Sequence, residues 1–331
     1  MEPKGCLLQL PTKFIRIICV CPPCVAVGEC DGEYKVSCFH PLTAYRAPPG
    51  SDFADGKQIS FDSRYRDHVG VVEFNLPCGQ CIGCRLESSR QWAMRICHEQ
   101  SLHKESCFIT LTYNDKNLPS DLSLCPDHMT LFIKRLRKAL GSKKIRFFYA
   151  GEYGSQTLRP HYHMCLFGHD FLDDRQIYKI TPGGDILWTS QTLEQLWGKG
   201  YAPFGQLTFD SAAYTARYIL KKITGDLAIE HYGNRHPEFV RMSRRPGIAA
   251  DWFSKYSSDV YPKDFVTIRN GIKCRPPRYY DKLFALNHCE ELFKIKKRRL
   301  ESVVADSQER LMAKERVTKL RTSTFLRRRL D

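Results

Sequence analysis

Short apolar runs in the middle of the chain have the pattern of buried strands. Cys107–Thr112 and Ile145–Tyr149 are rich in β-branched and aromatic residues, and His161–Phe167 is similar. Runs of this length and composition favour strands over helices. Because side chains at positions i and i+2 of a strand point to the same face, His161 and His163 are expected to project together.

Other segments carry apolar residues at helical spacing. Pro126–Leu140 has apolar residues three and four positions apart, with lysines and arginines on the other side, and Gly141 follows as a stop signal. Its basic side is expected to be solvated or to neutralise phosphates. Glu87–Gln100 has a helix-favouring composition, and Thr192–Trp197 is a short helix candidate.

A further strand and helix are predicted next along the chain. Tyr201–Phe209 alternates between apolar and polar residues, which is typical of a strand. Asp210 or Ser211 is expected to cap the following helix, Ala212–Ile223, and Gly225 to end it.

The order of these elements predicts the fold class. Strand, helix, strand, strand, helix, strand and helix follow one another, which indicates an α+β domain with helices packed on an antiparallel sheet. A polar, turn-rich hairpin, Gly151–Pro160, separates the second and third strands. The predicted divisions are an unassigned extension (1–37), a Cys-rich knuckle and helix (38–105), a core domain (106–225), a basic accessory region (226–288) and a charged helical or mobile tail without an obvious core face (289–331).

The composition indicates a globular protein with an anionic partner. Of 331 residues, 42% are hydrophobic and 12% aromatic, which is enough to bury a sizeable core. The net charge of +15 favours nucleic acid or an anionic membrane surface as a partner, with simple solubility as the alternative. No run approaches the roughly 18 apolar residues of a membrane span, and no signal-peptide layout is evident, so a cytosolic protein is expected.

The cysteines suggest a structural metal site. Fifteen cysteines, an odd number, in a chain of this length argue for reduced thiols rather than disulfides. Cys78, Cys81 and Cys84 have a spacing that lets three thiolates converge on zinc, which usually takes four ligands. Cys38 and Cys97 are the candidates for the fourth. An iron–sulfur cluster and plain reduced cysteines in a loop remain alternatives.

The paired histidines suggest a second metal site. His161 and His163 can grip one divalent ion, unless they are ordinary strand histidines. Mg²⁺ or Mn²⁺ needs a harder third ligand, and Glu152, at the far end of the same hairpin, is in register to provide it. His169 and Asp170, just beyond the strand, are weaker candidates.

A tyrosine pair follows on the last predicted helix of the core. Tyr214 and Tyr218 are one helical turn apart on one face, and Lys221 falls near both. A tyrosine can attack phosphorus and remain as a covalent phosphotyrosine, while a lysine can neutralise the phosphate or assist protonation of the leaving oxygen. Arg217 and Lys222 can support the DNA backbone. Tyrosines at this spacing also occur as packing residues.

Together these motifs resemble those of HUH endonucleases. The resemblance rests on the strand FITLTY, the His-Tyr-His strand and the helix YTARYILKK, in this order (Phe108–Tyr113, His161–His163 and Tyr214–Lys222). The Cys run from Pro77, the doubled tyrosine with Lys221, and the RMSRRPG segment (Arg241–Gly247) are similar in particular to rolling-circle replication initiators of Microviridae phages of the gokushovirus kind. The similarity covers about Cys38 to Tyr261.

The resemblance implies a fold and an activity. It implies a ferredoxin-like or RRM-like palm at 106–225 and a metal-dependent enzyme that nicks and rejoins single-stranded DNA at a phage origin through a 5′-phosphotyrosine. Tyr214 and Tyr218 would be the nucleophiles, assisted by Lys221. Contacts with DNA are expected from Arg159, Arg217 and Lys222.

The resemblance also implies partners and leaves alternatives. A host polymerase would extend the free 3′-hydroxyl in the bacterial cytoplasm. The sequence has no Gly-rich Lys-Ser/Thr phosphate loop, so a host helicase is expected to unwind the DNA. Alternatives are a transposase or relaxase of the same fold and a non-catalytic zinc-knuckle protein that binds nucleic acid.

Overall fold

A seven-stranded antiparallel sheet forms the centre of the fold. The computed structural model describes residues 38–154, 157–181, 183–217, 227–268, 271–302 and 306–327. The strand order in the sheet is β10-β5-β6-β4-β9-β8-β7. The strands are β4 (Ser106–Thr112), β5 (Arg146–Tyr153), β6 (Pro160–Phe167), β7 (Arg175–Ile180), β8 (Ile186–Ser190), β9 (Phe204–Gln206) and β10 (Phe239–Met242). The predicted α+β class with an antiparallel sheet is confirmed.

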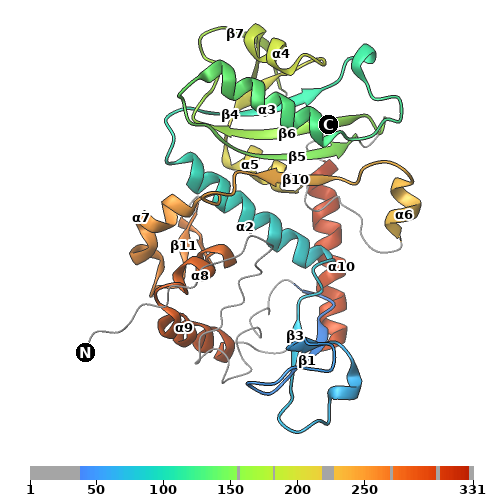
Figure 1. Cartoon of the computed structure of the whole chain (residues 1–331), viewed down its shortest axis with the longest axis vertical. Helices are drawn as coiled ribbons and strands as arrows, with labels where there is room; N and C mark the ends of the chain where they lie inside the picture. Colours follow the sequence, from blue (N-terminus) through green and yellow to red (C-terminus); the bar gives the residue numbers. More distant parts are fainter. Residues whose placement is uncertain are drawn as a thin grey trace.

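Helices cover both faces of this sheet (Figure 1). One face packs against α3 (Pro126–Leu140) and α4 (Gln191–Trp197), and the other against α2 (Ile82–Gln100) and α5 (Phe209–Arg217). The neighbouring residues Met164 and Cys165 of β6 illustrate the division, because each belongs to a different buried cluster. The core therefore consists of two apolar layers separated by the sheet.

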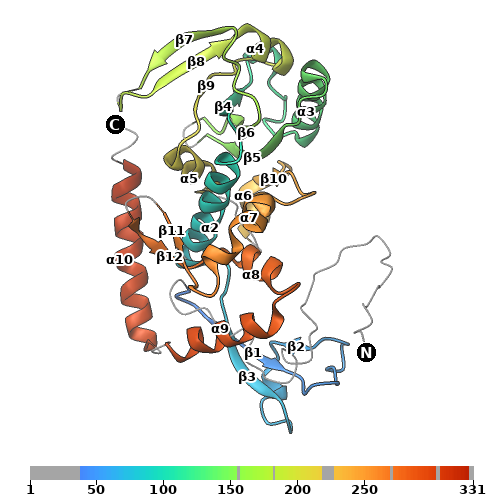
Figure 2. The same ribbon diagram turned by 90° about the vertical axis from the view of Figure 1, so that its left-hand side faces the viewer.

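The remaining elements lie on the α2 side and below it (Figures 1 and 2). Among the described residues, no helix is both long and apolar enough to cross a membrane. The helices are α6 (Leu227–Tyr232), α7 (Ala250–Val260), α8 (Arg278–Phe284), α9 (Cys289–Glu301) and α10 (Gln308–Arg327), with 3₁₀ turns at Ser63–Tyr65 and Asp115–Asn117. Two small sheets contain β1 (Leu42–Arg46), β2 (Ile59–Ser60) and β3 (Val72–Leu76), and β11 (Val266–Thr267) and β12 (Lys273–Cys274).

Local sequence explains the best-predicted elements. Pro126 occupies the first turn of α3, where its missing N–H costs nothing, and Gly141 ends the helix with a φ of 58°. The apolar stripe of α3 is buried against the sheet. In β4, Cys107, Ile109 and Leu111 are buried and alternate with partly exposed residues.

The segment before α5 corrects two predictions. The strand expected over Tyr201–Phe209 shrinks to β9, and the helix begins at its last residue. The cap is not Asp210 or Ser211 but Thr208, whose Oγ1 accepts a hydrogen bond from the Ser211 amide at 3.2 Å while Ser211 Oγ accepts one from the Thr208 amide at 2.8 Å. The predicted end at Gly225 lies outside the described residues.

Two other elements differ from the sequence prediction. The β7–β8 hairpin is not predicted, because β7 is exposed along its whole length and has no buried face to impose an alternating pattern. Helix α2 starts at Ile82 rather than Glu87, because Cys81 caps it by accepting a hydrogen bond from the Cys84 amide.

The C-terminal tail is helical in the described residues, but its first helix has a core face that the sequence does not reveal. Leu292 and Ile295 of α9 are buried in the lower apolar cluster. Arg299, 4% exposed, forms an ion pair with Asp281 of α8 at 2.8 Å and with Asp264 at 2.5 Å. Two carboxylates thus neutralise one buried guanidinium and attach α9 to the fold.

We predict that Arg299→Met destabilises the protein by about 3–5 kcal/mol, because it leaves buried carboxylates without their countercharge. The matched control, Arg298→Met, changes an exposed neighbour on the same helix and should shift stability by less than about 0.5 kcal/mol. Urea unfolding monitored by circular dichroism measures both. Equal midpoints for the two variants would contradict the structural role of Arg299.

Candidate active site and metal centres

Three potential metal ligands converge on one face of the central sheet. In the antiparallel register, Glu152 of β5 is directly opposite His161 of β6, and His163 lies two residues farther along β6. The i, i+2 spacing points both imidazoles to the α5 side. One ligand atom from each of the three residues lies within 4.8 Å of the others. The structure therefore brings together the three residues predicted to share an ion.

Hydrogen bonds orient both imidazoles toward the carboxylate. The Nε2 atoms of His161 and His163 lie 2.6 Å and 3.1 Å from Glu152 Oε1. The Nδ1 atoms have other partners, since His161 Nδ1 donates to the Arg159 carbonyl at 3.1 Å and His163 Nδ1 lies 3.1 Å from Thr110 Oγ1. Holding Nδ1 in this way is the usual means of directing Nε2 toward a metal.

Burial and hydrogen bonding set the charge of the site. Glu152 is 2% exposed and His163 5% exposed. Burial by itself raises the pKa of Glu152, but the hydrogen bonds from both histidines lower it further, so that the pKa lies well below its usual range. Two imidazoles and one ionised carboxylate form a donor set that suits a divalent cation.

Thr110 is part of this site and is not identified from the sequence. It lies on β4 directly opposite His163, and its hydroxyl is within hydrogen-bond distance of the imidazole. The neighbouring Phe108 stacks on the His163 ring with centroids 5.5 Å apart. The available signal is the alternation of β4, which puts Phe108 and Thr110 on the face opposite to Ile109.

Helix α5 packs beneath the strand that carries the histidines. Thr215 is buried, and its hydroxyl lies 3.6 Å from the thiol of Cys165, which is two residues from His163 on the same face. Tyr214 and Arg217 belong to this helix, although their side chains are outside the description. The other predicted residues of this segment, Tyr218, Lys221 and Lys222, lie outside the described residues.

Arg159 and the weaker ligand candidates lie elsewhere. Arg159 donates to the Tyr113 carbonyl at 3.1 Å and to Asp115 at 2.6 Å, next to the start of β6. His169 follows the other end of β6, where its Nδ1 is 3.3 Å from Lys143 Nζ. Neither His169 nor its neighbour Asp170 belongs to the three-residue group, so the geometry favours Glu152.

A second group of potential ligands is formed by four cysteines. The Sγ atoms of Cys38, Cys78, Cys81 and Cys84 lie within 4.8 Å of one another. Cys97, the other candidate for the fourth ligand, lies in α2 outside this group. The structure thus brings together four thiols, the number that structural zinc usually takes.

Backbone amides point at the sulfur atoms of this cluster. The amides of Phe39 and Cys84 donate to Cys81 Sγ at 3.3 and 3.5 Å, and the amide of Cys78 donates to Cys38 Sγ at 3.3 Å. Burial raises the pKa of Cys81, but these amide hydrogen bonds outweigh it and lower the pKa to about 7. The loop is therefore arranged to accept thiolate charge, as a metal site requires.

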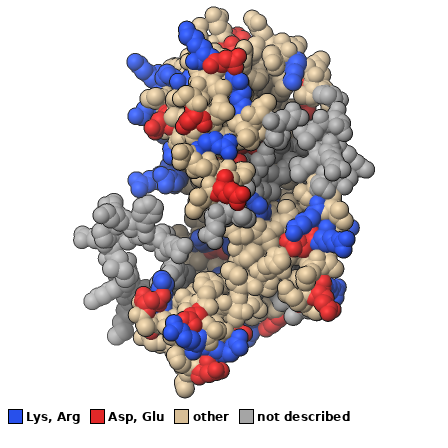
Figure 3. Space-filling view, turned by 90° about the vertical axis from the view of Figure 1, so that its right-hand side faces the viewer, with Lys and Arg blue, Asp and Glu red and all other residues tan. Residues whose placement is uncertain are grey.

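The surface charge is locally mixed. On the face shown in Figure 3, Lys and Arg side chains occur in small groups with Asp and Glu beside most of them, rather than as one continuous basic patch. The positive net charge is therefore spread over this face. Specific local arrangements, rather than a broad basic field, must direct any anion that binds there.

Comparisons with known proteins identify the family. Residues 106–223 match the model of a family described as Replication-associated protein of the ORF2 type. The chain is 34% identical over 261 residues to Replication-associated protein VP4 of Bdellovibrio phage phiMH2K, which covers 77% of this chain and 79% of that protein. It is 34% identical over 265 residues to Replication-associated protein ORF2 of Spiroplasma virus 4, covering 75% and 80%.

A third relative is Replication-associated protein ORF4 of Chlamydia phage 1, with 30% identity over 239 residues, 69% of this chain and 59% of that protein. No solved structure gives a significant match. The matched family region spans β4, β6 and α5, which are the elements that build the Glu152 site. The chain belongs to the family of replication-associated proteins of Microviridae-like phages.

Proposed function

We propose that this protein is a replication initiator that nicks and rejoins single-stranded DNA at a phage origin through a 5′-phosphotyrosine. The observation that carries the proposal is the convergence of Glu152, His161 and His163 on the sheet face that packs against α5, the helix of Tyr214. Membership in a replication-associated family supports the biological role. In this reading, residues 106–225 form an HUH palm of the ferredoxin-like kind.

The three ligands prepare a place for a scissile phosphate. When bound, Mg²⁺ or Mn²⁺ supplies Lewis-acid catalysis by polarising a non-bridging oxygen. Because Thr110 and the Arg159 carbonyl fix the Nδ1 sides of the imidazoles, the ligands need little rearrangement. A preorganised donor set keeps its alignment during the reaction, which is where electrostatic catalysis originates.

The chemical step requires a nucleophile from α5 or the segment after it. The phenolic oxygen of Tyr214 or Tyr218 attacks phosphorus, the bond to the 3′-oxygen breaks, and that oxygen leaves as a hydroxyl after taking a proton. Lys221 assists the leaving oxygen, while Arg159, Arg217 and Lys222 hold the strand. A host polymerase then extends the 3′ end, and a host helicase unwinds the duplex.

The four-cysteine cluster has a structural role in this proposal. It binds zinc at the start of α2, the helix that packs along α5. Leu311 of α10 packs against the same cluster. Zinc binding would thus join the N-terminal knuckle, α2 and α10 into one unit that supports the sheet.

His163→Ala should reduce nicking of a single-stranded origin oligonucleotide by about a hundredfold or more, since an ion contributes several kcal/mol to the transition state. DNA binding should persist. His169→Ala, a histidine outside the cluster, is the control and should keep most of the activity. Gel analysis of cleavage with Mn²⁺ measures this. Nicking by His163→Ala at the wild-type rate, or in excess chelator, would exclude the assignment.

Tyr214→Phe and Tyr218→Phe should each still form some covalent adduct with an origin oligonucleotide, and the double variant should form none. Phenylalanine keeps the packing and removes only the nucleophilic oxygen. Tyr201→Phe, which alters an exposed tyrosine outside the helix, is the control. Denaturing gels and mass spectrometry detect the adduct.

The same capture experiment separates the alternative functions. DNA linked to both tyrosines supports a replication initiator that passes from one covalent strand to the next. Labelling of a single tyrosine would leave a nickase of the transposase or relaxase kind. Absence of any adduct with an origin oligonucleotide would leave a non-catalytic zinc-knuckle DNA-binding protein.

Metal analysis of the protein purified under reducing conditions should find about one tightly bound zinc per chain. Cys38→Ser should lose most of that zinc and unfold at a lower temperature, because metal binding stabilises the folded state. Cys97→Ser, which removes a thiol outside the cluster, should retain it. Zinc retained in Cys38→Ser and lost in Cys97→Ser would show that the cluster has been assigned wrongly.

A further inference from the structure

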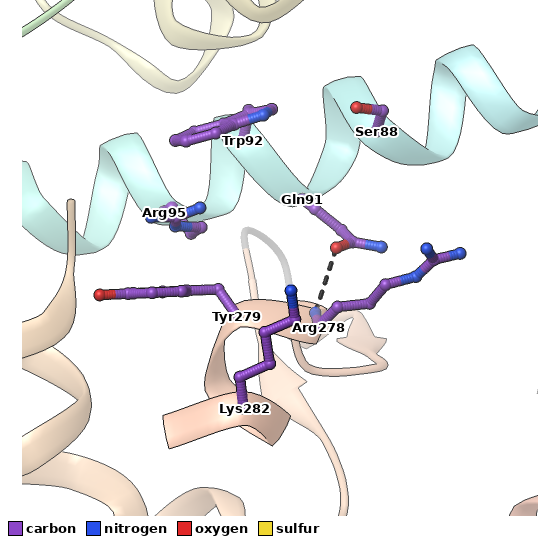
Figure 4. A pocket seen from close by; sticks show the side chains of 7 residues that line it. All are labelled: Ser88, Gln91, Trp92, Arg95, Arg278, Tyr279 and Lys282. Atoms are coloured by element: carbon purple, nitrogen blue, oxygen red, sulfur yellow. Dashed lines mark hydrogen bonds between the residues drawn. The ribbon is translucent and has the colours of Figure 1, made fainter. Parts of the chain in front are cut away.

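A small pocket between α2 and α8 lies outside the candidate active site (Figure 4). Its volume is about 200 Å³. Trp92 and Arg95 enter it from α2, and Arg278, Tyr279 and Lys282 enter it from α8. None of its lining residues is acidic. Three cations and two aromatic rings therefore surround a space of the size of a small anion.

Arg95 forms the base of the pocket and is held in place on several sides. Its Cζ lies 4.0 Å from the Trp92 ring centroid and 3.9 Å from that of Tyr279, so the guanidinium lies between two aromatic faces. Nε and Nη2 donate to the Ile248 carbonyl at 3.2 and 3.0 Å. The side chain is thus ordered before any ligand arrives.

The charge of Arg95 is not neutralised by a direct ion pair. The residue is 9% exposed, and burial lowers its pKa to about 10, which still leaves it cationic at neutral pH. In the part of the chain that the structure describes, no carboxylate lies within ion-pair distance of it. A buried cation in this condition favours an anionic ligand, because pairing would offset the cost of its desolvation.

Nearby carboxylates on α2 are already engaged. Glu87 accepts hydrogen bonds from Arg90 at 2.5 and 2.7 Å, and Glu99 accepts from Arg146 and, at 3.1 Å, interacts with His103. Their negative charge is compensated locally. An anion entering the pocket would therefore meet net positive charge from Arg95 and from the two exposed cations of α8.

The two helices are held in register across the pocket. The Arg278 amide donates to the Gln91 side chain at 3.1 Å, which fixes the start of α8 against α2 (Figure 4). Lys282 lies one turn later on α8 and points its ammonium toward the same space in Figure 4. The cations thus come from a rigid frame rather than from loops.

We propose that this pocket binds a backbone phosphate of single-stranded DNA, as a second anchor for the strand that the active site cleaves. The ligand class rests on the proposed function, since a protein that acts on DNA meets phosphodiesters as its main anions. Arg is suited to phosphate because its planar guanidinium offers several donors, and Lys adds a point charge.

The location of the pocket suits an anchor near the cleavage site. The Trp92 ring packs on Phe148 with centroids 4.9 Å apart, and Phe148 precedes Glu152 by four residues on the same face of β5. At about 3.3 Å per residue, the pocket is at least about 13 Å from the ligands. Roughly four nucleotides of a stacked strand span that distance.

The test compares two double variants that remove the same charge. Arg278→Gln with Lys282→Gln removes two cations from the pocket, and Lys294→Gln with Arg298→Gln removes two exposed cations from α9. Binding of a labelled single-stranded oligonucleotide of about 20 nucleotides, longer than usual site sizes, is followed by fluorescence anisotropy at several salt concentrations. Excess chelator prevents cleavage, so the measurement is independent of nicking.

The pocket variant should bind about tenfold more weakly than the wild type, from the loss of charge-assisted hydrogen bonds. Its slope of log affinity against log salt should fall by about 0.7, the value for one phosphate contact on a single strand. Inorganic phosphate, substituted for chloride at equal ionic strength, should weaken binding more in the wild type than in this variant. The α9 variant should change little.

Equal losses in the two variants would overturn the pocket and leave only a general effect of net charge. Wild-type affinity and slope in the pocket variant would overturn it as well. Competition by inorganic phosphate that is the same in all three proteins would exclude phosphate as the ligand. Failure of covalent capture would remove the proposed nickase while leaving this binding measurement intact, so the two proposals can fail separately.

Discussion

The candidate active site depends on the register between β5, β6 and β4. A shift of one residue in an antiparallel pair turns every side chain to the other face of the sheet. Such a slip in β6 would send both histidines into the apolar layer under α3 and expose Met164 to the layer of α2 and α5. The buried apolar residues that alternate with the histidines therefore fix the positions of the ligands, because moving His161 and His163 would also expose the core.

Helix α2 connects the other features to that register. Its first turn is capped by Cys81 of the cysteine cluster, its middle carries Trp92 and Arg95, and its last turns pack beneath the sheet. Because a helix is stiff over this length, a change at the cysteine end alters how the pocket residues and α5 meet the sheet. A structural metal at the start of α2 would therefore affect the active site without touching it.

Sequence reasoning succeeds where one local pattern determines the outcome. The i, i+2 rule brings His161 and His163 together, and the apolar stripe with Pro126 defines α3. It fails where the partner is distant in the sequence. The spacing of the three clustered cysteines cannot choose between Cys38 and Cys97 for a fourth ligand, because that choice depends on how β1 and β3 bring the N-terminal side next to α2. The β7–β8 hairpin escapes because its exposed strand carries no burial pattern.

Two buried arginines show how the same residue type takes different roles. Arg299 pairs with two carboxylates, so its charge is neutralised within the fold and it holds α9 in place. Arg95 is equally enclosed, but its hydrogen bonds go to a neutral carbonyl and its neighbours are aromatic rings. Its positive charge is therefore left to act on whatever enters the pocket. Composition cannot separate these cases, because the difference lies in the groups that each guanidinium contacts after folding.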